Sequence, residues 1–64
     1  MKEGEQYVSN AHRNGLITQA QLSVLRKHAR HQSAIHMYVM LRQIINDRLP
    51  IPEAHKAAMR MVGR

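Results

Sequence analysis

The sequence predicts an all-α protein, a small bundle of three to four short helices that forms dimers. Residues 18–49 contain neither Gly nor Pro, their apolar residues recur at helical spacing, and start and stop signals for helices flank them. The chain has 64 residues and no cysteine, so we expect one helical domain, residues 1–64, stabilised by helix packing and self-association rather than by disulfides. The helices are expected over residues 3–14, 19–30, 34–48 and 52–62.

Charge and a glycine delimit the first helix. Glu3 and Glu5 lie in its opening turn and Arg13 in its last turn, where the helix macrodipole favours each sign of charge. Gly15 predicts a sharp stop, because glycine readily adopts the left-handed conformation that ends many helices. The chain is therefore expected to turn directly after the first helix.

A capping box predicts that the second helix begins at Gln19. Thr18 is the expected N-cap, and Gln21 has the spacing to bond back to the backbone of Thr18. Ile17 before the cap and Leu22 after it are spaced as a hydrophobic staple. These are local signals that do not depend on the rest of the fold.

The apolar pattern of residues 19–49 changes phase near its middle. At about 100° per residue, the apolar faces of residues 22–29 and 34–45 differ in direction by roughly 120°. The polar segment between them ends in Ser33, a suitable N-cap. We therefore expect two helices joined by a tight turn. The alternative is one rod of about 45 Å with a switched face, which would suit an extended dimer.

The third helix is apolar on nearly all sides. Its run of five consecutive apolar residues would also suit a strand, but turn residues and a pairing partner are missing. A chain this short offers such a helix few neighbours, so we expect a second copy to cover part of it. The expected dimer or partner interface consists of Met37, Tyr38, Met40, Leu41, Ile44 and Ile45.

Two prolines mark the boundary before the last helix. Pro50 ends the third helix, because the residue before a proline avoids the α conformation. Pro52 suits the first position of the next helix, and Glu53 follows in its first turn. The last helix is expected to be amphipathic, with one basic face. It can fold back on its own chain or onto a partner copy.

The charge distribution favours a polyanionic partner. The chain carries 10 Lys and Arg against 4 Asp and Glu, a net charge of +6, and has no acidic residue between Glu5 and Asp47. Such a surface attracts nucleic acid, and we expect a basic accessory or regulatory protein that binds it by electrostatic contacts with phosphates. The expected contact residues are Arg26, Lys27, Arg30, His31, Lys56 and Arg60.

A protein-interaction module is the alternative function. Five methionines and an excess of apolar surface suit an inhibitor or adaptor that binds an acidic surface of a larger protein. An ordinary helix-turn-helix is not expected, because its reading helix would be the apolar third helix. Single-strand binding by stacking is not favoured either, since the chain has no Phe or Trp and only two tyrosines, Tyr7 and Tyr38. Of these, Tyr38 is expected in the core.

Catalysis and metal binding are not expected. The chain has no Cys nucleophile and no Gly-rich phosphate loop, and its four acids are scattered, so we expect no enzyme, catalytic residue, cofactor or small-molecule substrate. His28, His31 and His36 have spacings that suggest metal ligands, but neighbouring basic residues repel a cation. Without an apolar leader or membrane span, we expect no membrane partner and a cytoplasmic location.

Overall fold

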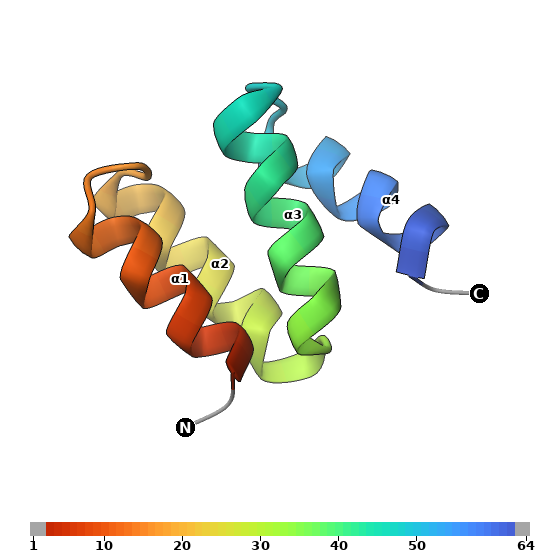
Figure 1. Cartoon of the computed structure of the whole chain (residues 1–64), viewed down its shortest axis with the longest axis horizontal. Coiled ribbons are helices and arrows are strands. Elements are labelled where there is room, and N and C mark those ends of the chain that lie inside the picture. Colours follow the sequence, from red (N-terminus) through yellow and green to blue (C-terminus); the bar gives the residue numbers. More distant parts are fainter. Residues whose placement is uncertain (1–2, 63–64) are drawn as a thin grey trace.

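The computed structural model describes residues 3–62, and between these limits it contains helices and no strand. The all-α prediction is therefore confirmed. The third helix ends two residues earlier than predicted, and the fourth begins one residue earlier, at Ile51. The helices are α1 (Glu3–Arg13), α2 (Gln19–His31), α3 (Ala34–Asn46) and α4 (Ile51–Val62) (Figure 1).

The end of α1 follows the predicted glycine stop. Gly15 has φ 75°, which is the left-handed conformation. Its backbone N–H donates to the carbonyl of His12 at 3.0 Å, and the N–H of Leu16 donates to the carbonyl of Ala11 at 2.9 Å. These two bonds are those of a Schellman motif, and they satisfy carbonyls that the end of a helix leaves without partners.

The start of α2 has the predicted capping box. The Thr18 hydroxyl accepts a hydrogen bond from the Gln21 backbone N–H at 3.1 Å. In return, the Gln21 side-chain oxygen accepts from the Thr18 backbone N–H at 2.8 Å. Both donors are satisfied locally, so the position of this helix start is encoded within four residues.

The predicted break between α2 and α3 is present, and the single rod is wrong. Gln32 is extended, with φ −115° and ψ 157°, and ends α2. Ser33 caps α3, and its hydroxyl accepts from the backbone N–H of His36 at 3.1 Å. The break lets α3 turn back across the first two helices instead of continuing away from them.

The helix α3 lies at the centre of the arrangement. It packs against α1 and against α4, while α2 packs mainly against α1. In Figure 1, α1 lies in front of α2, and α3 stands between this pair and α4. The last helix thus folds onto its own chain. The core consists of Val8, Ala11, Ile17, Leu22, Leu25, Ala29, Met37, Met40, Leu41, Ile44, Ala54 and Ala58.

Small residues bring two helices close to α3. A Cβ atom on Gly4 would lie 3.0 Å from Cγ of Met37, so the glycine lets the first turn of α1 lie directly on α3. Ala54 and Ala58 are fully buried and let α4 approach in the same way. The first turn of α1 and the inner face of α4 therefore cover opposite parts of the apolar third helix.

Within one chain, this packing already buries most of the predicted dimer interface. Four of its six residues face the core of their own chain, because α1 and α4 together supply the neighbours that we expected from a second copy. Tyr38, expected in the core, is instead 51 % exposed, and Ile45 is half-buried at the edge of the core. The four buried residues are Met37, Met40, Leu41 and Ile44.

Length and hydropathy of the helices bear on membrane insertion. Within residues 3–62, no helix combines the length and the apolar character that crossing a membrane requires.

Candidate nucleic-acid interface

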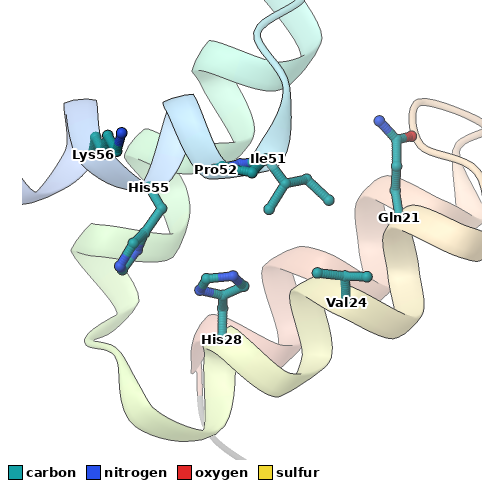
Figure 2. A pocket seen from close by; sticks show the side chains of 7 residues that line it. All are labelled: Gln21, Val24, His28, Ile51, Pro52, His55 and Lys56. Carbon is teal, nitrogen blue, oxygen red and sulfur yellow. The ribbon is translucent and has the colours of Figure 1, made fainter.

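A groove of about 670 Å³ lies between α2 and α4. It forms because α2 packs on α1 while α4 packs on α3, which leaves a space between the two outer helices. Figure 2 looks into this space, with α2 and α4 in front. Most of its surface is apolar. The lining residues are Gln21, Val24 and His28 from α2 and Ile51, Pro52, His55 and Lys56 from α4.

Two imidazoles meet across the groove. His28 extends from α2 and His55 from α4, and the two side chains point toward one another (Figure 2). Their ring centroids are 4.8 Å apart and the rings are tilted by 52°. They lie at one end of the groove, where the two outer helices come into contact through these side chains.

A third imidazole lies behind this pair. His36 of α3 is only 4 % exposed, and its Nε2 lies 3.0 Å from Nδ1 of His55. The ring centroids of His36 and His55 are 5.0 Å apart. His55 therefore contacts one histidine on α2 and another on α3, and we call His28, His36 and His55 the histidine cluster.

Two members of the cluster, His28 and His36, favour the neutral form. Burial lowers the pKa of His28 below its usual value of 6.5, and the adjacent positive charge of protonated His55 lowers it further. Burial likewise lowers the pKa of His36, and the charges of His55 and His28 add to the effect. At neutral pH, His28 and His36 therefore present uncharged aromatic rings.

The structure groups the histidines differently from the sequence pattern. His28 and His36 meet through His55, which sequence reasoning had not selected. His31 lines a hollow together with His28 and His55. The position of His55 in the sequence does not predict its contacts with histidines on two other helices. Among the side chains that the structure describes, no three His, Cys, Asp or Glu residues are arranged to hold a metal ion.

A second hollow of about 280 Å³ adjoins the groove. His28 and His55 line both, so the two spaces are neighbours. Lys27 and His31 line the second hollow, and Lys56 lines the groove. Within residues 3–62, no carboxylate lines either one. We call the two hollows together the basic groove; Gln32 completes the lining of the second.

Three of the six predicted phosphate contacts lie elsewhere. Arg26 and Arg30 are exposed, but at about 100° per residue they lie on the side of α2 opposite the groove. Arg60 is exposed one turn beyond Lys56 and does not line the groove. The predicted residues that the fold brings together are thus Lys27, His31 and Lys56.

A different surface covers the opposite side, where α1 and α3 meet. The rings of Tyr7 and Tyr38 are 6.0 Å apart between centroids, and the guanidinium of Arg42 lies 5.9 Å from the centroid of Tyr38. Leu16 is 53 % exposed, and a hollow of about 280 Å³ includes it, both tyrosines and the half-buried Ile45. We call these five residues the tyrosine face.

In comparisons with protein-family models, curated proteins and solved structures, nothing matches this chain. The function is therefore inferred from the chemistry of the two surfaces, since a helical fold of this kind is compatible with many activities.

Proposed function

We propose that the protein binds nucleic acid through the basic groove and acts by binding rather than by catalysis. The observation that supports this proposal is the placement of Lys27, His31 and Lys56 around adjoining hollows whose lining contains no carboxylate among residues 3–62. Lysine ammonium groups bind phosphates as point charges, and cations on two different helices can hold successive phosphates of one strand.

The net charge supports the same partner. At +6, the chain attracts a polyanion from a distance, and each phosphate neutralised by Lys or Arg releases condensed counterions. An acidic protein is the second candidate, because the largely apolar surface between His28 and Ile51 would also suit an apolar side chain flanked by carboxylates. DNA, RNA and an acidic peptide are therefore the three partners to compare.

Fluorescence anisotropy with labelled DNA and RNA at low salt tests the proposal. We expect binding that weakens as salt rises, with log K falling against log salt by about 0.7 to 0.9 for each phosphate contacted. The double variant Lys27→Glu, Lys56→Glu should abolish or strongly weaken binding and make its salt dependence shallower. Both substituted residues are exposed, so the fold should be retained.

A matched control is Arg13→Glu, Arg26→Glu, which changes the net charge equally at two exposed positions. Neither residue lines the basic groove. Equal loss of binding in the two double variants would show a non-specific charge effect and contradict a role for the groove. No binding of any nucleic acid, together with capture of an acidic peptide, would favour the protein-interaction alternative.

We further propose that a second copy packs on the tyrosine face. Tyrosine and arginine are enriched at protein interfaces, and this face presents both next to exposed apolar side chains. Two copies repel each other because of their net charge, but Arg42 is the only charged residue of the tyrosine face, so each copy brings a single positive charge to the contact. The basic groove, on the opposite side, stays open in such a dimer.

A further inference from the structure

The groove between α2 and α4 has an apolar surface that phosphate binding does not require. Phosphates are held by cations at the surface, whereas Val24, Ile51 and Pro52 give this groove apolar walls. Its volume of about 670 Å³ lies within the range of roughly 300 to 1,000 Å³ that is usual for small-molecule sites. Val24 is 43 % exposed, so water covers apolar surface here until a ligand replaces it.

We infer that the groove receives an unpaired base of a single-stranded nucleic acid, whose flanking phosphates contact Lys27 and Lys56. This inference rests on the proposed function and specifies the kind of nucleic acid. The ligand has to combine a flat, largely apolar group with negative charge next to it, because apolar walls and imidazoles lie between cations. A nucleotide within a strand has this combination.

The histidine cluster supplies the aromatic surfaces. Proteins that bind single strands stack exposed bases on aromatic side chains, histidine among them. His28 and His55 lie at one end of the groove, and the contact of 3.0 Å with His36 holds the ring of His55 in place. The side-chain amide of Gln21, which also lines the groove, can donate to or accept from the edge of a base.

A duplex does not fill this groove. In a duplex the bases are stacked and paired inside, so a basic protein surface contacts mainly its phosphates. Bound at Lys27 and Lys56, a duplex would leave the walls at Val24 and Ile51 exposed to water. Tyr7 and Tyr38 alone offer little stacking surface in the sequence, but the fold adds the imidazoles of His28 and His55, which it brings together.

Anisotropy titrations of the full chain with three probes test the inference. The probes are a short oligothymidylate, the same oligomer paired with its complement, and an abasic strand with the same number of phosphates. A stacked base contributes enough to change affinity by about tenfold or more. We therefore expect the oligothymidylate to bind at least about tenfold more tightly than the abasic strand, and more tightly than the duplex.

Val24→Lys separates base insertion from charge. The longer side chain fills part of the groove but adds a positive charge, so a purely electrostatic contact would become tighter. We expect the roughly tenfold preference over the abasic strand to fall toward equality. The control is Ile35→Lys on α3, where the native side chain is 65 % exposed and lines neither hollow of the basic groove; it adds the same charge and should keep the preference.

The outcomes distinguish the two proposals. Equal affinity for the oligothymidylate and the abasic strand, or tighter binding of the duplex, would overturn base insertion and leave the nucleic-acid function intact. A preference that Val24→Lys does not reduce would also overturn it. No binding of any of the three probes, together with no binding of RNA, would overturn both proposals.

Discussion

Nε2 of His36 lies 3.0 Å from Nδ1 of His55, a contact that joins α3 to α4 beside the basic groove. A hydrogen bond between two imidazoles needs a donor on one ring and a lone pair on the other, so at least one of the two rings is neutral. His28 contacts the same ring from α2. Protonation of the cluster thus places like charges where three helices meet.

The free energy of unfolding should fall as the pH falls below about 6.5. In the folded protein the pKa values of His28 and His36 are lowered from that value, so below it the unfolded chain binds more protons than the folded one. Stability is therefore fully present above about pH 6.5 and decreases on acidification until the folded protein is protonated as well. Lys27 and Lys56 line the hollows beside the cluster.

Urea unfolding followed by circular dichroism, at pH values from about 5 to 8, measures this dependence. His36→Gln should make the stability vary less with pH, because it removes a titrating group with a lowered pKa. His12→Gln, outside the cluster, is the control for the loss of an imidazole. A wild-type protein equally stable across this range would contradict the prediction.

Arg48→Gly should stabilise the protein. Arg48 follows the end of α3 with φ 57°, a left-handed conformation that costs a residue with a Cβ about 1 to 2 kcal/mol. The backbone on either side is held, since the N–H groups of Asp47 and Leu49 both donate to the carbonyl of Gln43 at 3.1 Å. The greater freedom of glycine in the unfolded chain offsets part of the gain, so we expect a net increase of about 0.5 to 1 kcal/mol.

Chemical denaturation of Arg48→Gly and Arg48→Ala gives the comparison. Both variants lose the same charge, but alanine keeps the Cβ, so only the glycine variant should be more stable than the wild type. An equal gain in the two variants would show that removal of the charge, and not relief of the backbone, is responsible.

Tyr38→Glu should keep the protein monomeric. Tyr38 is half-exposed and packs beside Tyr7 and Arg42, so the fold tolerates a polar side chain there, whereas two copies would bury its charge. Size-exclusion chromatography with light scattering at micromolar concentration should give a dimer for the wild type and a monomer for the variant. Ile35→Glu, at an exposed position outside the tyrosine face, is the control and should dimerise. A monomeric wild type would exclude the dimer.

Much of the local structure could be predicted because its causes lie within a few residues of one another. The capping box joins Thr18 to Gln21, and the stop at Gly15 depends on its own backbone conformation. The break at Ser33 followed from a change in the direction of the apolar face, which is also a local property. Helical periodicity also identified the buried face of α2, with Leu22, Leu25 and Ala29. It did not identify that of α3, where Tyr38 is exposed.

The site was predicted only in part. Three of the residues expected to bind phosphates do line the basic groove: Lys27, His31 and Lys56. The charge pattern could not distinguish them from Arg26, which lies on the other side of α2. Their place depends on how α2 is rotated relative to α4. That rotation is set by the packing of each helix on a different neighbour.

By itself, the sequence determined the helical class, the helix ends within two residues, and the positive charge that favours a polyanion. Only the tertiary structure decided that His36 meets His55 across 19 residues of chain, and that Tyr38 lies at the surface. The physical reason is the range of the interactions. Caps and turns form between neighbours in sequence, whereas the groove and the histidine cluster arise from packing between helices that sequence periodicity does not orient.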